Sequence, residues 1–273
     1  MKRLQYLLLL GTIATVGSSA QSLENILLII NYNFAHYQSI PLLTRIYKKQ
    51  FKDIVFYGPE QGQGVTQYNL NNGYLSYMCI ADAMKKYPTC SGYFFLMDDC
   101  ILNAQFLVSL DQSKIWFPEI SFLNGVRGNM LNILKKADAT NWAWWHTQWG
   151  WQAMLKAYTE LSESYRQVLD QNCDSSCIMA AYSDLVYIPA CYKDKFVELA
   201  ELFGKYEVFL EMALPTIVAC LCNRTEWVWL RGHGIDRKDP VSNFKLEEYF
   251  NHPMKLSDQA TYNFIEKIFN AKG

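Results

Sequence analysis

Two adjacent carboxylates, Asp98 and Asp99, follow an apolar run at residues 93–97. Such a run predicts a buried strand, and unpaired carboxylates at its end are costly to desolvate. In an α/β sheet the carboxyl ends of the strands open into a ligand crevice. Because carboxylate oxygens are ligands for Mg²⁺ and Mn²⁺, the pattern predicts a cation that carries the phosphates of a substrate. The alternative is that one carboxylate only caps the turn into Ile101.

Five tryptophans fall within ten residues, a density that could form a stacking platform for sugar rings. Tryptophan clusters more often fill a core. Because the spacings do not put all five on one face, we expect at least one or two to be exposed. The five are Trp142, Trp144, Trp145, Trp149 and Trp151.

The elements that must position the carboxylates alternate between strand and helix. Apolar runs at residues 25–30 and 54–57 predict buried strands, and a helix is expected between them at residues 40–50. A second helix, expected over residues 73–87, leads into the strand that ends at Asp98. This alternation predicts an α/β fold with a mostly parallel central sheet and helices on both faces.

The second half of the chain is expected to be mixed. Strands are predicted at residues 113–117 and 183–189, and helices at residues 192–203 and 207–214. One amphipathic helix is expected near the end of the chain. Because no Gly/Ser/Pro-rich linker interrupts the middle, we expect a single domain.

Composition and absent motifs exclude several classes of protein. The hydrophobic content of 51% and the aromatic content of 15% exclude disorder, and a net charge of -1 leaves no basic surplus for a nucleic acid partner. No Gly-x-Gly-x-x-Gly turn follows the first strand, and no Gly-Lys-Ser/Thr loop marks a nucleotide hydrolase. Neither a Gly-x-Ser-x-Gly elbow nor a His-Glu-x-x-His motif occurs.

Residues 1–20 have the three zones of a secretory signal peptide: a basic start, an apolar middle and small residues before the expected cleavage point. We therefore expect one mature domain over residues 21–273. No later transmembrane span is expected, because the apolar stretch at residues 210–222 is interrupted by Glu211 and Pro215.

Entry into the secretory pathway would place the eight cysteines in an oxidising compartment, where an even number favours disulfides. Cys79 and Cys90 could close one tight loop and Cys173 and Cys177 another. The connectivity stays open. Asn223 begins an Asn-Arg-Thr acceptor for N-linked glycosylation, which is consistent with exposure to the lumen.

Several segments of the sequence resemble the glycosyltransferase-like domain of STELLO-type proteins. They lie at residues 31–58, 93–103, 111–116, 183–189 and 252–257, so the similarity spans most of the expected mature chain. The order of βαβ units, a strand ending in carboxylates and a late histidine is similar to that of the GT-A fold. The resemblance implies a GT-A-like domain that transfers a sugar from a nucleotide-diphosphate donor with the help of Mn²⁺ or Mg²⁺.

In that fold a carboxylate motif at a strand end holds a metal that bridges the diphosphate of the donor. The usual pattern is Asp-x-Asp, and this chain departs from it because Cys100 stands at the third position. The matching variant implies Asp99 as metal ligand and Asp98 as a contact to the ribose or a support for the ligand, with the reverse assignment open. The resemblance also implies His252 as second metal ligand and Lys255 as a partner of the diphosphate.

Alternatives to these late ligands stay open. His252 and Lys255 could form an exposed turn held by Pro253, or His233, which lies between two glycines, could be the metal ligand. His36 is expected only to cap or pack against the first helix.

The resemblance also implies roles for residues outside the carboxylate motif. Asn31 and Tyr32 follow the first strand, where the base and ribose of the donor bind, although a plain turn explains the same residues. Glu211, on the helix expected at residues 207–214, is the candidate general base for an acceptor hydroxyl. Its apolar neighbours would raise its pKa, unless it faces solvent on an amphipathic helix.

The leading hypothesis is a secretory-pathway glycosyltransferase with a nucleotide-diphosphate sugar as donor and a glycan or glycoprotein as acceptor. It would act in the Golgi lumen or be secreted. The alternative is a glycosyltransferase-like lumenal protein that binds glycans or partner proteins and has lost turnover. Cys100 favours the alternative, whereas His252 with Lys255 favours catalysis.

Overall fold

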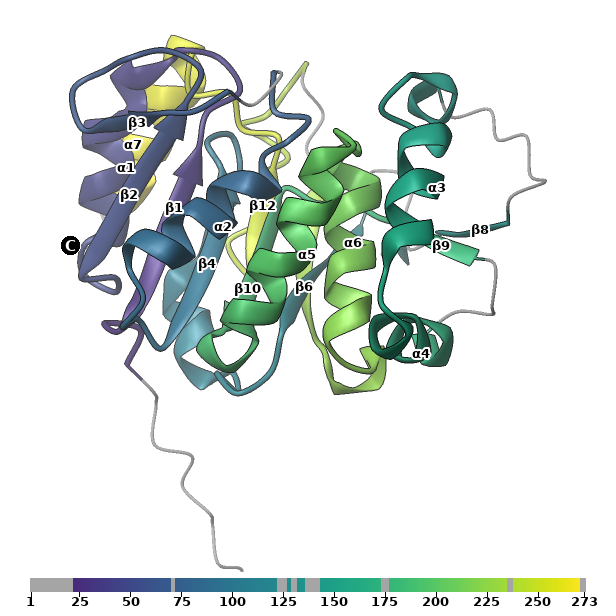
Figure 1. Cartoon of the computed structure of the whole chain (residues 1–273). Helices are drawn as coiled ribbons and strands as arrows, with labels where there is room; N and C mark the ends of the chain where they lie inside the picture. Colours follow the sequence, from purple (N-terminus) through teal and green to yellow (C-terminus); the bar gives the residue numbers. More distant parts are fainter. Residues whose placement is uncertain are drawn as a thin grey trace, which may run out of the picture.

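The computed structural model describes residues 22–69, 72–121, 127–128, 132–135, 143–172, 177–234 and 238–270. The expected signal peptide at residues 1–20 lies outside the described residues. Ten strands of the described part form one sheet, flanked by helices (Figure 1). In order along the sheet, the strands are β3 (Val65–Gln67), β2 (Asp53–Gly58), β1 (Ile26–Asn31), β4 (Gly92–Met97), β10 (Leu185–Pro189), β6 (Trp116–Ser121), β11 (Val228–Gly234), β12 (Phe250–His252) and β5 (Ile101–Leu102), with β7 (Arg127–Gly128) beside β6.

Most of the sheet is parallel, as the sequence predicts. Strands β3, β2, β1 and β4 run parallel to one another, and so do β6, β11 and β12 in the second half. Strand β10 is antiparallel to both of its neighbours, β4 and β6, and β5 is antiparallel to β12. A separate antiparallel pair joins β8 (Asn132–Lys135) to β9 (Cys177–Ala180). The fold is therefore α/β with a mostly parallel sheet and a mixed second half.

Helices cover both faces of the sheet (Figure 1). One face carries α2 (Tyr77–Lys86), α5 (Lys193–Lys205) and α6 (Leu210–Leu221), with α3 (Trp151–Glu160) and α4 (Glu163–Asn172) beyond them. The other face carries α1 (Ile40–Tyr47) and α7 (Gln259–Asn270), which an ion pair of 2.5 Å between Arg45 and Glu266 connects. The beginning and the end of the described chain thus meet on one side of the sheet.

Strands β1 and β4 are buried on both faces, which explains their unbroken apolar sequences. Because side chains of a strand alternate between faces, Leu27 and Phe95 join the core under α2, α5 and α6, while Leu28 and Phe94 join the core under α1 and α7. Each buried side chain of this size contributes about 1.5–3 kcal/mol to stability.

Some boundaries differ from the predicted ones because turns intervene. The helix expected over residues 73–87 begins only at Tyr77, since Gly73 has a φ of 93° and starts a turn. The helix expected at residues 207–214 begins and ends later, as α6, because Glu207 has a φ of 52°. Strands β11 and β12 were not predicted: β12 has three residues, and β11 ends in Gly-His-Gly, which shows no regular alternation.

Cys79 and Cys90 are both free thiols, so the tight loop that they could have closed is not present. Cys79 is buried in the core, where it packs between strand and helix, whereas Cys90 is only partly buried. Cys173 lies outside the described residues, as does the side chain of Cys177.

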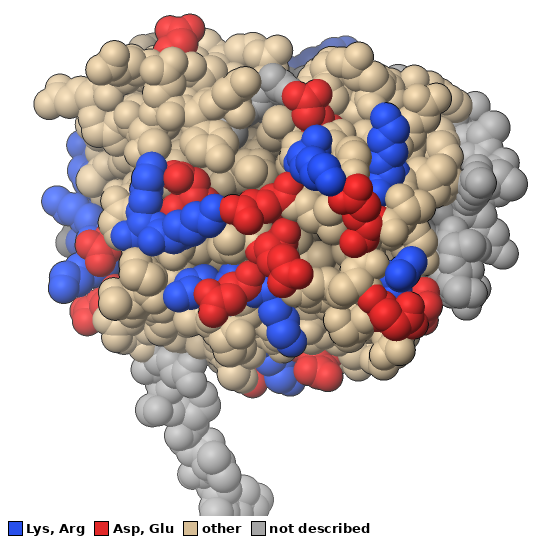
Figure 2. Space-filling view, in the orientation of Figure 1, with Lys and Arg blue, Asp and Glu red and all other residues tan. Residues whose placement is uncertain are grey.

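Charges of both signs are mixed on the face formed by α2, α3, α5 and α6 (Figure 2). Ion pairs such as Lys85–Glu201 and Lys205–Glu160 join neighbouring helices there. This face therefore offers no surface of a single sign to a polyanion. Within the described ranges, no helix has the length and apolar character that a membrane crossing requires.

Candidate functional site

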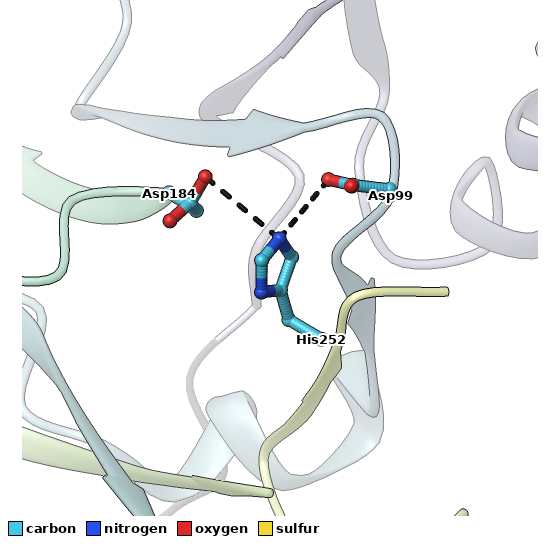
Figure 3. A group of neighbouring side chains, drawn as sticks. All are labelled: Asp99, Asp184 and His252. Carbon is cyan, nitrogen blue, oxygen red and sulfur yellow. Dashed lines mark ion pairs between the residues drawn. The ribbon is translucent and has the colours of Figure 1, made fainter. Parts of the chain in front are cut away.

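Three side chains converge at the carboxyl end of β4 (Figure 3). Asp99 lies in the turn after β4, Asp184 directly precedes β10, and His252 ends β12. The Nε2 atom of His252 is 3.2 Å from Oδ1 of Asp99 and 3.8 Å from Oδ1 of Asp184. One ligand atom of each residue lies within 4.8 Å of the others, a separation that a single metal ion can span.

The sheet explains why these distant residues meet. Because β10 is antiparallel to β4, its first residue lies at the end of β4, and the N–H of Met97 donates to the carbonyl of Asp184 at 2.9 Å. Strand β12 pairs with β5, directly after the carboxylates, through Asn251 and Ile101. The N–H of Met254 donates to the carbonyl of Asp99 at 2.6 Å, so both sides of His252 are fixed against the carboxylate turn.

Lys255 joins the same group from the surface. Its ammonium donates a hydrogen bond to Oδ2 of Asp99. The side chain of Lys255 is 53% exposed, whereas that of Asp99 is 9% exposed. A cavity of about 360 Å³, lined in part by Lys255 and Lys238, opens at this point. Lys255 therefore connects the buried carboxylate with a cavity that is also lined by the carboxylates of Asp239 and Asp258.

Acidic groups outnumber basic ones in this centre. Burial, with the charge of Asp99, raises the pKa of Asp98 to about 8, and burial raises the pKa of Asp184. Burial would also raise the pKa of Asp99, but the charges and hydrogen bonds of His252 and Lys255 outweigh it and lower that pKa. Burial would lower the pKa of His252, but the charges of Asp99 and Asp184 raise it. A further cation would relieve the repulsion among these carboxylates.

Glu211 lies in the first turn of α6, close to this cluster. Its backbone carbonyl accepts a hydrogen bond of 2.9 Å from the N–H of Ala181, three residues before Asp184. Burial, together with the charge of Asp184, raises the pKa of Glu211 to about 8. Glu211 is therefore half-buried rather than turned to solvent, and it binds a proton more tightly than an ordinary glutamate.

Tyr182 packs against the imidazole of the centre. Its ring meets His252 edge to face with centroids 5.1 Å apart and stacks on Phe250 at 6.4 Å. Burial and the charge of Asp184 raise the pKa of the Tyr182 phenol well above its ordinary value. Tyr182 thus borders two of the three converging residues.

The donor set fits a divalent cation. Carboxylate oxygens suit Mg²⁺ and Mn²⁺ alike, and the imidazole nitrogen favours Mn²⁺. Cys100 is fully buried in the core and takes no part, so Asp184 supplies the carboxylate that the Asp-x-Asp pattern lacks. The sequence did not predict Asp184 as a metal ligand, because its only local signal is a carboxylate at the start of a predicted strand.

Asn31 and Tyr32 are not placed to contact a donor. Both are fully buried. The Asn31 amide donates to Ser76 Oγ at 2.9 Å and accepts from the Cys79 thiol at 3.6 Å, and the Tyr32 hydroxyl shares a hydrogen bond of 2.7 Å with Ser39. The stacking of Tyr32 on a base is therefore not supported, because its side chain is buried and bonded within the protein.

The other histidines lie apart from the cluster. His233, the rival ligand, is on β11 opposite Asn251 of β12, and burial lowers its pKa. It is not among the grouped metal-binding side chains of the described residues. His36 precedes the first helical turn and is exposed, and His146 is exposed as well.

None of the three tryptophans of the cluster whose side chains are described is exposed, so the exposure that the spacing predicted is not seen among them. Trp145 is buried and stacks on Trp151 with centroids 4.8 Å apart, in the core beneath α3. Trp149 is half-buried and contacts Tyr74 instead. Trp142 and the side chain of Trp144 lie outside the described residues.

No protein-family model matches this chain. The chain is 21% identical over 229 residues to a protein of Arabidopsis thaliana named probable glycosyltransferase STELLO2. The match covers 80% of this chain and 28% of that protein, so the chain spans little more than a quarter of its relative. This distant homology confirms the resemblance that the sequence motifs indicated.

Two solved structures also match. One is the crystal structure of a glycosyltransferase involved in the glycosylation of the major capsid of PBCV-1, at 9% identity over 90% of this chain and 99% of that chain. The other is the apo structure of the WbbM bifunctional glycosyltransferase, at 10% identity over 94% of this chain and 52% of that chain. With a TM-score of 0.40 in both cases, neither match assigns the fold.

Proposed function

We propose that this chain is a glycosyltransferase of GT-A type that binds Mn²⁺ and uses a nucleotide-diphosphate sugar as donor. The observation that carries the proposal is the convergence of Asp99, Asp184 and His252 at the carboxyl end of β4. Distant homology to a probable glycosyltransferase supports sugar transfer as the chemistry. Mg²⁺ is the alternative ion, and the imidazole makes it the second choice.

Each residue of the centre has a role in this proposal. Asp99, Asp184 and His252 would hold Mn²⁺, which would supply stabilisation of negative charge on the departing diphosphate. Lys255, half exposed at the wall of a cavity, is placed to pair with a phosphate oxygen. Asp98 is next to Asp99 but only partly buried, which suits a contact to the ribose.

Glu211 would act as general base. The oxygen of the acceptor hydroxyl forms a bond to the anomeric carbon of the donor sugar while the bond from that carbon to the diphosphate oxygen breaks. The nucleoside diphosphate leaves with the bonding electron pair, and Glu211 accepts the proton of the hydroxyl. Its raised pKa, about 8, is what supports this assignment.

A second candidate function is favoured by one observation. Asn31 and Tyr32, expected to contact the base and ribose of the donor, are buried and bonded within the protein. A chain without donor contacts there would bind glycans or partner proteins through a glycosyltransferase-like fold and would not turn over. Binding of Mn²⁺ and UDP distinguishes this candidate from the first.

We also propose that the mature domain spans residues 21–273 and enters the secretory pathway, in the Golgi lumen or beyond. The support is the sequence of residues 1–20 and the acceptor motif at Asn223. Asn223 begins a short helical turn, and the two residues after it, Arg224 and Thr225, are exposed, so the motif lies at the surface.

The test is calorimetric titration of the purified chain with Mn²⁺, followed by UDP with Mn²⁺ present and by a screen of UDP- and GDP-sugars for release of the nucleotide. Wild type should bind Mn²⁺ and then UDP. Asp99→Asn and Asp184→Asn should each weaken Mn²⁺ binding, and Glu211→Gln should keep binding while losing transfer.

Asp170→Asn is the matched control, because Asp170 is exposed on α4. The control should behave as wild type. Mn²⁺ binding that survives loss of both Asp99 and Asp184 would end the proposal. Binding of Mn²⁺ without binding of UDP would support the second candidate.

A further inference from the structure

Trp149 differs from the other tryptophans whose side chains are described. Those others lie in or against one of the two hydrophobic cores, whereas Trp149 belongs to neither. Its ring and that of Tyr74 lie 5.1 Å apart, centroid to centroid, at 47°, and both residues are half-buried. Tyr74 also meets the buried ring of Phe209 edge to face at 5.4 Å. We refer to Tyr74, Trp149 and Phe209 as the aromatic platform.

One side of the aromatic platform is joined to the helix that carries Glu211. The N–H of Phe209 donates to the carbonyl of Trp149 at 2.9 Å. Phe209 is the N-cap residue of α6, so Glu211 follows within the first turn of that helix. The platform is therefore fixed beside the candidate base by the backbone itself.

The other side of the aromatic platform is joined to the end of β1. Gly73, directly before Tyr74, has a φ of 93°, and a Cβ there would lie 2.0 Å from Oδ1 of Asn33. Ser76 donates to the carbonyl of Gly73 at 2.7 Å and accepts from Asn31, the last residue of β1. The position of Tyr74 is thus tied to the edge of the sheet where the metal-binding side chains converge.

We propose that the aromatic platform is an acceptor subsite, in which Trp149 and Tyr74 hold a sugar ring of a glycan while Glu211 faces the hydroxyl that reacts. This inference rests on the proposed function and adds the place and the kind of acceptor. One face of a pyranose ring is lined by C–H groups, which pack flat on an aromatic ring, while its hydroxyls stay at the rim for polar partners.

The observations favour a sugar over the nucleobase of the donor. Recognition of a nucleobase needs hydrogen-bonding groups at its edge. The side chains of Asn31 and Asn33, at the end of β1, already bond to each other at 3.3 Å, and Asn31 also bonds to Ser76. The carboxylate of Glu211, by contrast, follows the platform directly in the chain. Because the aromatic platform lies beside Glu211, the general base that acts on the acceptor, we assign the platform to the acceptor.

The test uses the full chain on an array of immobilised oligosaccharides, with Mn²⁺ and UDP present. Wild type should bind a subset of the array. Trp149→Ala should weaken that binding about three- to tenfold, the size expected for one aromatic stack, and Trp149→Phe should restore most of it. Affinity for UDP with Mn²⁺, measured by calorimetry, should stay within about twofold of wild type.

Tyr87→Ala is the matched control, because Tyr87 is 38% exposed at the opposite end of α2. It should bind the array as wild type does. Array binding that is unchanged in Trp149→Ala, or absent in wild type, would overturn the inference. Loss of UDP affinity in Trp149→Ala with glycan binding intact would assign the platform to the nucleobase. Glycan binding through Trp149 without any binding of Mn²⁺ or UDP would leave the subsite standing and reject the proposed transferase.

Discussion

Strands β1 and β4 are parallel neighbours, and both end in polar residues at the same edge of the sheet. At the end of β1, the Asn31 amide has its partners inside the protein, in Ser76, Asn33, Met97 and Cys79. At the end of β4, the carboxylates crowd against further carboxylates, and among the residues that the structure describes only the side chains of His252 and Lys255 oppose them. One strand end is satisfied within the fold and the other is not.

The difference shows what a polar residue after a buried strand signifies. A buried amide can satisfy both its donor and its acceptor locally, so it stabilises the fold and stays closed to ligands. Adjacent carboxylates can only accept hydrogen bonds, and they repel one another, so they need a cation from outside. The comparison predicts that changes at the β1 end affect stability, while changes at the β4 end affect metal binding.

The largest effect is expected at the end of β1. Asn31→Ala removes the buried amide and leaves a small cavity, so the free energy of unfolding should fall by about 3 kcal/mol. Urea denaturation measures this, and Asn263→Ala, on the exposed surface of α7, should change it by less than about 0.5 kcal/mol. Loss of UDP binding at full stability would instead place Asn31 in a donor site and remove the contrast.

The next effect is expected at the end of β4. Asp184→Asn should weaken Mn²⁺ binding by about 100-fold. Loss of a group that only orients a metal ligand already lowers metal affinity by up to about 100-fold. The metal-free protein should become more stable, because burial disfavours the charged form of Asp184 and raises its pKa. Calorimetry and urea denaturation measure the two changes, and a fall in stability would show that Asp184 is a structural carboxylate.

Glu211 provides a pH-dependent test of the same contrast. The folded protein holds a proton at Glu211 up to about pH 8, while the unfolded chain releases it near the ordinary value of 4.5. Between these values the folded state binds more protons, so wild type should lose stability relative to Glu211→Gln as the pH rises. The difference should approach about 2 kcal/mol by pH 8.

Urea denaturation at a series of pH values measures that difference. Below pH 4 the two proteins should have equal stability. A difference that is constant across the whole range would mean that the titration of Glu211 is not responsible.

The smallest effect is expected at Tyr182. Tyr182→Phe keeps the ring against His252 and removes the hydroxyl near Asp184, so Mn²⁺ affinity should fall about three- to tenfold with little change in stability. Titration with Mn²⁺ measures this. An unaltered affinity would show that the ring alone positions the imidazole.

The strands that carry the site were predictable because burial on both faces leaves an unbroken apolar run. Strands β1 and β4 begin and end within one residue of the predicted runs, and the structure brings Asp99 and His252 together as expected. The position of Asp184 was not predictable, because it depends on the antiparallel insertion of β10 between two parallel strands. Local sequence does not encode which strand becomes a neighbour.

Departure from the core within the tryptophan cluster was predictable only in part. The spacing required that some side chains leave the core, but it did not identify Trp149 as one of them. That outcome depends on the backbone bond between Trp149 and Phe209, which joins segments far apart in the sequence. Likewise, Tyr32 looked available because it follows a strand, and the partner that buries it, Ser39, is in the next helical turn.

The two residue pairs between β5 and β12 set the register that places His252 beside the carboxylates. Since neighbouring positions of a strand face opposite ways, a slip of β12 by one residue against β5 would turn His252 away from Asp99, whereas a slip of two would keep it on the same side. Any redesign of β12 to admit a different ion should therefore keep this register.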